Sequence, residues 1–268
     1  MAARDGARIV ITGLGVVSPV GIGNDAFWAS LQKNRSGIDF LSIPHEGLPS
    51  AFGAEVRDFD PTEHLRDRKF LKVMSRDMQL GVASSRLAVA DSGFSDGDID
   101  PLRLGVTFGA GRMTTHPAEL SAAVEACRTN SNEVNMTRWG EDGLGQIAPL
   151  WLLRQLPNMP ACHVSIDNNA RGPNNTITSR DASALLALAE AVRVIEANRA
   201  DAMIVGACSS NIHPVDIAKF HSFEGLSQRA DDPARACRPF DFERDGAVVG
   251  EGAATFVVER YEHAVRRG

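Results

Sequence analysis

The stretch that decides the fold reads Arg171-Gly172-Pro173-Asn174-Asn175-Thr176-Ile177-Thr178-Ser179-Arg180-Asp181-Ala182-Ser183, and a long alanine-rich apolar run follows it. Its Gly-Pro pair predicts a turn, and the β-branched residues after it predict a short strand. The apolar run up to Ala200 predicts a helix with little polar surface. A sharp bend between strand and helix would place Asp181 at a buried helix start. Enzymes keep nucleophiles at such a position, but here it holds a carboxylate.

The segments on either side of this stretch alternate between strand and helix patterns. Residues 202–207 form an apolar run too short for a helix, as expected of a central strand that is covered on both faces. Such alternation predicts a layered α/β fold. Further strands are predicted at residues 8–12, 104–111, 161–166, 176–178 and 253–259, and helices at residues 25–32, 69–92, 146–156 and after Asp181.

Two segments do not follow this alternation. Residues 113–145 mix polar and apolar positions without a clear period, which predicts an insertion that lies over the core. The glycines at positions 13, 15 and 21 suggest a nucleotide loop at first sight. Their spacing does not match the dinucleotide fingerprint, and no Lys-Ser/Thr pair follows as in a P-loop. We therefore expect a turn between residues 13 and 21.

Composition narrows the classes of function. The chain has 268 residues, 43% of them hydrophobic, which is enough to bury a sizeable core. A net charge of -6 without a basic run argues against nucleic acid as a partner. No apolar segment is long enough to span a membrane, and no signal peptide is evident, so we expect a cytoplasmic protein.

The cysteines and histidines indicate neither a disulfide framework nor a metal site. The cysteines are scattered without C-x-x-C spacing, so we expect reduced and mostly buried thiols at positions 127, 162, 208 and 237. No histidine pair has metal-ligand spacing. His163 is expected to be a strand residue, and His213 and His221 are expected to be loop residues. No bound cofactor or metal is expected.

Several motifs together resemble the β-ketoacyl synthase family, the condensing enzymes of the thiolase-like superfamily that act in fatty acid and polyketide biosynthesis. They occur in family order along the whole chain, at residues 10–15 with 18–21, 105–111, 171–173, 201–207 and 238–253. The resemblance implies a thiolase-like layered α/β/α fold, with residues 1–268 as the N-terminal βαβαβαββ half of a protein built from two similar halves. Residues 113–145 would then overlap the region that family members use at their dimer interface.

The resemblance also implies what this chain lacks. The family's nucleophilic cysteine falls on Asp181 when residues are counted from the Gly172-Pro173 pair. A helix N-terminus would stabilise its negative charge, but a carboxylate is a poor nucleophile toward a thioester. The two catalytic histidines, the lysine and the glycine-rich phenylalanine loop belong to the family's second half and have no counterpart here.

Three hypotheses follow. The leading one is a catalytically silent subunit that resembles the chain-length factors, pairs with an active ketosynthase-like chain or a second copy, and meets phosphopantetheine only on an acyl-carrier protein. The apolar run around Leu185, Leu186, Leu188, Val192 and Ile195 would then contact the partner. The alternative is a condensing or malonyl-decarboxylating acyltransferase whose second half lies on another chain or has been removed. In a third hypothesis, compatible with the first, Asp181 is a structural N-cap balanced by Arg180 or Arg171.

Overall fold

A computed structural model describes residues 8–44, 47–95, 97–111 and 114–268. Within this part of the chain, a six-stranded mixed sheet has the strand order β2-β1-β8-β7-β5-β6. Strand β8 runs antiparallel to both of its neighbours, whereas β7, β5 and β6 run parallel to one another. The strands are β1 (Ile9–Ser18), β2 (Gly21–Ile22), β5 (Leu104–Ala110), β6 (Asn174–Ile177), β7 (Ala202–Ser210) and β8 (Glu251–Arg260).

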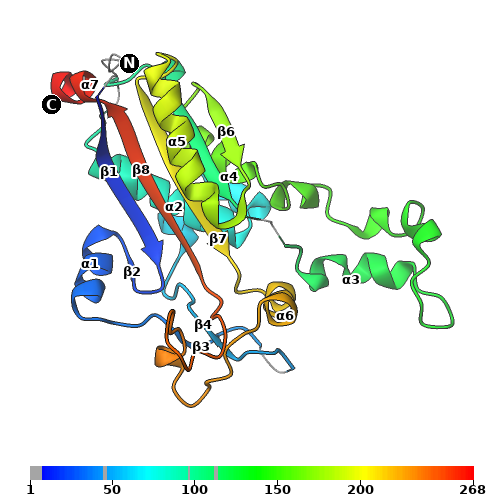
Figure 1. The fold of residues 1–268 in the computed structure, drawn as a ribbon. Coiled ribbons are helices and arrows are strands. Elements are labelled where there is room, and N and C mark those ends of the chain that lie inside the picture. Colours follow the sequence, from blue (N-terminus) through cyan, green and yellow to red (C-terminus); the bar gives the residue numbers. More distant parts are fainter. Residues whose placement is uncertain (1–7, 45–46, 96, 112–113) are drawn as a thin grey trace, which may run out of the picture.

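Helices cover both faces of this sheet, which confirms the layered α/β prediction (Figure 1). On one face lies α2 (Arg76–Asp91), packed on β1, β8 and β7, with α4 (Met159–Asp167) beside it. On the other face α5 (Ser183–Glu196) packs on β5, β7 and β6. The remaining elements are α1 (Asn24–Gln32), β3 (Asp39–Phe40), β4 (Phe52–Gly53), α3 (Pro117–Ala126), α6 (Pro214–Phe223) and α7 (Tyr261–Arg267).

Each helical layer has its own apolar core. Phe108 and Ile204 of the sheet pack with Leu80 on the α2 side. Met203 and Val258 pack with residues of α5 on the other side. Neighbouring positions on one strand face opposite layers, as the pleat requires. The short apolar run at 202–207 is therefore buried on both faces, as its composition predicted.

Glycines lie inside β1, where the sequence predicted a turn. Gly13 and Gly15 continue the strand because α2 crosses it at very short range. A Cβ on Gly13 would lie 2.2 Å from the carbonyl oxygen of Ala88, and one on Gly15 would lie 2.0 Å from that of Ser84. The turn prediction was therefore wrong for these two positions, whose role is close backbone packing.

Two helix and strand assignments were also wrong. Residues 161–166 were predicted as a strand but lie in α4, which packs between α2 and β5. Residues 146–156 were predicted as a helix but contain only short 3-10 turns. The second segment leaves Leu150 and Leu152 exposed, and a helix in water needs a covered apolar face to persist.

We call residues 114–158 the arm. It begins with α3 and extends away from the sheet (Figure 1). The predicted insertion, residues 113–145, falls within the arm except for residue 113, which lies outside the described residues. The arm therefore forms a projection beside the layered body.

Candidate functional site

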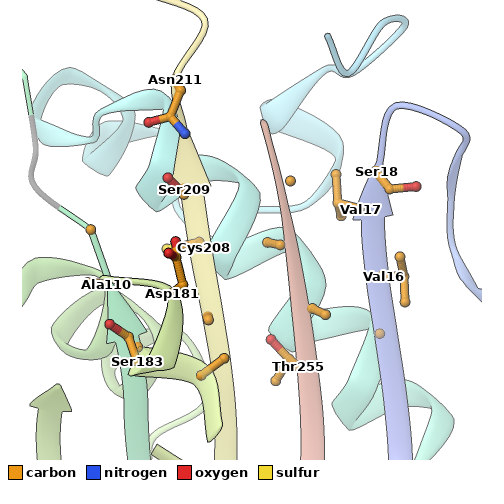
Figure 2. Close-up of a pocket in the computed structure, with 18 of the residues that line it drawn as sticks. Val16, Val17, Ser18, Ala110, Asp181, Ser183, Cys208, Ser209, Asn211 and Thr255 are labelled. Atoms are coloured by element: carbon orange, nitrogen blue, oxygen red, sulfur yellow. The ribbon is translucent and has the colours of Figure 1, made fainter. Parts of the chain in front are cut away.

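A groove of about 1370 Å³ opens beside the start of α5. Its walls come from β1, β8 and β7, from the end of β5, and from α1 and α6. Figure 2 shows how the ends of these strands bring their side chains together next to Asp181 and Ser183. The groove thus lies where the opening stretch of sequence meets the ends of the central strands.

Asp181 lies in this groove at the bend before α5, and it is exposed, whereas the sequence predicted a buried position. It belongs to a single 3-10 turn, Arg180–Ala182, which leads directly into α5. Within the described part of the chain its carboxylate shows no hydrogen bond, and α5 has no side-chain cap. The N-cap hypothesis for Asp181 was therefore wrong.

Ser183 forms the hydrogen bonds that hold the bend. Its hydroxyl accepts a hydrogen bond from the backbone N–H of Ser179 and donates one to the carbonyl oxygen of Arg180, each at 2.7 Å. The start of α5 can approach β5 closely because position 109 is glycine. A Cβ on Gly109 would lie 2.8 Å from the carbonyl carbon of Ser183. Ser183 and Gly109 therefore determine the shape of the bend. The Asp181 side chain is exposed on it.

Arg180 pairs with Glu224 rather than with Asp181. Arg180 has a left-handed backbone with φ of 52°, an unusual conformation for a residue other than glycine. Its guanidinium pairs with the carboxylate of Glu224 at 2.7 Å, at the end of α6. Both partners line the groove. Arg180 therefore does not balance Asp181 as predicted, but links the bend to α6 across the groove.

A polar cluster lies at the end of β7, next to Ser209 and Asn211, which line the groove. Asp77 accepts a hydrogen bond from the backbone N–H of Ser210 at 2.6 Å, and Glu251 accepts one from the Ser210 hydroxyl at 2.7 Å. Burial raises the pKa of Asp77 to about 6, and the carboxylates of Asp216 and Glu251 add to the increase. Arg76 pairs with Glu251 at 2.9 Å and compensates its charge.

Two side chains of nucleophile type in the groove, Cys208 and Ser183, are not activated. Cys208 lines the groove, but burial raises the pKa of this thiol well above its ordinary value, and the Asp77 carboxylate adds to the effect. The Ser183 hydroxyl already uses its proton and a lone pair in the bend. A reactive thiol needs a lowered pKa and access, and Cys208 has neither.

The cysteines and histidines differ from expectation in several places. All four cysteines lie in the described part of the chain and are free thiols, with Cys127 and Cys208 buried, Cys162 half-buried and Cys237 exposed. His163 is buried in α4 rather than in a strand. His213 lies in the bend before α6 and caps this helix, in agreement with the loop prediction, whereas His221 lies within α6.

The described residues form neither a cluster of metal ligands nor a membrane-spanning helix. Among them, no group of three or more His, Cys, Asp or Glu side chains is placed to hold a metal ion. None of the helices in the same part of the chain combines the length and apolar character of a membrane span.

Apolar side chains remain exposed around the groove and along α5. The uncovered face, as we call it, is marked by Leu14 of β1, Trp28 of α1, and Leu185 and Leu186 of α5. Leu185 is 74% exposed and Trp28 is 61% exposed. Leu185 and Leu186 are exposed, as the predicted contact surface on α5 requires. The prediction is wrong for Ile195, which is fully buried against the sheet.

Sequence reasoning did not find several residues that shape the groove. The Arg180–Glu224 pair joins residues 44 positions apart, and the cluster of Asp77, Ser210 and Glu251 spans most of the chain. No local pattern connects them. Ser183 was within reach of sequence reasoning, because a serine two positions after a sharp bend commonly bonds the local backbone.

Comparison with known proteins identifies relatives across nearly the whole chain. A family model described as "Beta-ketoacyl synthase, N-terminal domain" matches residues 6–264. A "Putative polyketide beta-ketoacyl synthase 1" of Streptomyces cyaneus is 37% identical, with 97% of this chain and 60% of the relative covered. A "3-oxoacyl-[acyl-carrier-protein] synthase 2" of Coxiella burnetii is 36% identical, with 97% of this chain and 59% of the relative covered.

A solved structure shows the same fold. The ishigamide ketosynthase/chain length factor superposes with a TM-score of 0.82 at 24% identity, covering 98% of this chain and 60% of that chain. The chain therefore spans about 60% of the length of the relatives and the structure that it matches.

Proposed function

The chain belongs to the β-ketoacyl synthase family, and we propose that it acts as a catalytically silent, chain-length-factor-like subunit in fatty acid or polyketide biosynthesis. In this role it would pack against an active ketosynthase-like chain and shape the cavity that holds the growing acyl chain. It would form no covalent acyl intermediate of its own.

The observation that carries this proposal is the side chain at the bend before α5. The strand, the bend and the helix together hold one side chain at the bend. In this chain that side chain is the carboxylate of Asp181. A carboxylate that attacked a thioester would form an acyl anhydride, which water cleaves readily. Of the other hydroxyl and thiol groups that line the groove, the Cys208 thiol has a raised pKa, and the Ser183 hydroxyl is occupied by two backbone hydrogen bonds.

The uncovered face supports a protein partner. Exposed leucines and a tryptophan lie together beside a large groove, as expected of a surface that another chain covers. We propose a ketosynthase-like chain as the partner, with a second copy of this chain as the other arrangement to be tested. The family's two-half architecture favours an occupant of similar fold.

The acyl-carrier protein is the proposed source of the acyl chain. One relative is named as a synthase that acts on an acyl-carrier protein, and we extend this partner to the present chain. Phosphopantetheine would enter attached to that carrier, so we propose no resident cofactor. Location in the cytoplasm stays a prediction from the sequence.

The test is acyl transfer followed by intact-mass spectrometry. The chain is mixed with acyl-loaded carrier protein, both alone and together with a ketosynthase-like chain from its own cells. We expect no acyl adduct on this chain and a stable adduct on the partner. The Asp181→Asn variant should behave like the natural chain. Asp181→Cys should gain the acyl mass once the partner is present.

Two outcomes would overturn the proposal. One is a stable acyl adduct on the natural chain. The other is malonyl-thioester decarboxylation that appears on mixing and disappears in Asp181→Asn, because that result would assign the carboxylate a catalytic role and favour the enzyme hypothesis.

A further inference from the structure

Two short motifs of the same kind meet at the base of the arm. His116-Pro117-Ala118-Glu119 begins α3, and His213-Pro214-Val215-Asp216 begins α6. In each motif the histidine is the N-cap, the proline is the first helical residue, and an acidic residue completes the first turn. The motifs lie 97 positions apart and come together only in the folded chain.

Each histidine caps its helix through the same ring nitrogen. His116 Nδ1 accepts a hydrogen bond from the backbone N–H of Ala118 at 3.2 Å. His213 Nδ1 accepts one from the backbone N–H of Val215, also at 3.2 Å. A nitrogen that accepts carries no proton, so each neutral ring holds its proton on Nε2. A protonated ring would turn an N–H toward each backbone N–H and lose the cap.

The two rings also contact each other. Their centroids are 5.2 Å apart, and the ring planes are nearly perpendicular, with an interplanar angle of 87°. Edge-to-face packing of this kind suits neutral rings. Two charged rings at this distance would repel, and a single charged ring would already have lost its cap. His213 Nε2 is buried and has no partner among the described residues.

The two carboxylates near the rings, Asp216 and Glu119, each pair with a basic side chain. Asp216 of α6 is buried, pairs with Lys219 at 3.2 Å and accepts a hydrogen bond from Thr114 at 2.9 Å. Glu119 of α3 pairs with Arg154 at 3.0 Å and accepts a hydrogen bond from Gln155.

These surroundings favour the neutral form of His213. Burial lowers its pKa, and the positive form of His116 would lower it further. The carboxylates of Asp216 and Glu119 act in the opposite direction without reversing the shift.

We propose that the His116–His213 contact is a proton-sensitive latch that holds the base of the arm against α6 while both rings are neutral. Protonation of either ring would break its cap and the ring contact and would loosen α3 from α6. Because Lys219, Phe220 and Glu224 of α6 line the groove, the protonation state of the latch would also alter the groove wall.

Hydrogen exchange of the intact chain tests this proposal. Protection factors, corrected for the intrinsic pH dependence of exchange, are compared over a series from about pH 7.5 to about pH 4.5, which extends well below the ordinary histidine pKa because burial lowers the pKa of His213. Peptides that cover residues 114–126 and 213–223 should lose protection roughly tenfold at the acidic pH, the effect expected for a lost helix cap. Peptides from β5 and β7 should not lose protection at the acidic pH.

Matched variants separate the latch from general acid sensitivity. The double variant His116→Asn and His213→Asn keeps a side-chain acceptor at each cap but cannot titrate, so its protection should not depend on pH. His221→Asn, which removes an exposed histidine of the same helix, should keep the behaviour of the natural chain. Unchanged protection in the natural chain, or a loss that persists in the double variant, would overturn the proposal.

A second measurement does not depend on the variants folding. Nitrogen-15 spectra of the histidine rings at neutral pH report which nitrogen carries the proton. We expect the Nε2–H form for both His116 and His213. An Nδ1–H form at either ring would contradict the capping geometry and with it the latch.

Discussion

Ser183 and Asp181 lie two positions apart in the same bend and have different roles. The Ser183 hydroxyl makes two backbone hydrogen bonds, whereas the Asp181 side chain makes none in the described part of the chain. We expect Ser183→Ala to lower the free energy of unfolding by about 1–2 kcal/mol, because two part-buried hydrogen bonds to the backbone are lost.

Asp181→Ala is the matched comparison for this prediction. It should change the free energy of unfolding by less than about 0.5 kcal/mol, as is usual for an exposed side chain without specific contacts. Urea denaturation of both variants measures the difference. If Asp181→Ala were the more destabilising of the two, the assignment of structural roles in the bend would be wrong.

Asp77 makes the stability of the fold depend on pH. Its pKa is about 6 in the folded chain, against an ordinary value of 3.8. The folded state therefore binds more protons than the unfolded state between these values, and the free energy of unfolding falls as pH rises through this window. At neutral pH the ionised carboxylate costs up to about 3 kcal/mol.

The variant Asp77→Asn tests this dependence, since its amide oxygen can still accept the hydrogen bond from Ser210. It should be more stable than the natural chain at neutral pH, and the difference should shrink toward about pH 4. Denaturation curves at several pH values provide the measurement. Asp231→Asn, at an exposed acid, should leave the pH profile unchanged, and a flat profile in the natural chain would refute the prediction.

At the scale of elements, the crossing of α2 over β1 depends on positions without a side chain. A Cβ on Gly15 would lie 2.0 Å from the carbonyl oxygen of Ser84 and 2.5 Å from the backbone nitrogen of Ala88. Both atoms belong to the backbone of α2, so they can move away only if the helix itself shifts. We expect Gly15→Ala to cost about 1–3 kcal/mol or more, as overpacking of a core does.

Gly140→Ala is the control for this prediction, because nothing lies within 4 Å of a Cβ added there. Thermal unfolding of the two variants should show a clear decrease in Tm for Gly15→Ala and almost none for Gly140→Ala. Equal effects would mean that the loss of backbone freedom, rather than helix packing, determines the outcome.

At the scale of the whole molecule, the uncovered face distinguishes this chain from a self-contained domain. Leu185 lies about one turn after Asp181 on α5 and is 74% exposed. We expect Leu185→Glu to abolish co-purification with a ketosynthase-like chain while leaving the Tm of the isolated chain nearly unchanged, because the side chain supports no core contact.

Leu102→Glu is the matched control, since Leu102 is 65% exposed but precedes β5 at the end of the sheet away from the groove. It should leave partner binding intact. Loss of binding in both variants, or in neither, would count against the uncovered face as the partner surface.

The sequence by itself determined the elements whose local pattern and burial agree. The apolar run at 202–207 became a strand because it is covered on both faces, and the alanine-rich run after Asp181 became α5. The strand, the bend and the helix around Asp181 follow from neighbouring residues, so their order along the chain was predictable. The family followed from motifs that keep their order along the chain.

Only the tertiary structure decided the rest, because those features depend on contacts between distant segments. Residues 161–166 form a helix since α2 and β5 provide the surfaces that cover it, and the segment at 146–156 lacks such cover. Gly13 and Gly15 continue a strand because α2 crosses there. Asp181 is exposed, the Arg180–Glu224 pair spans the groove, and two distant histidines meet at the arm, because backbone packing brings together residues that no local pattern relates.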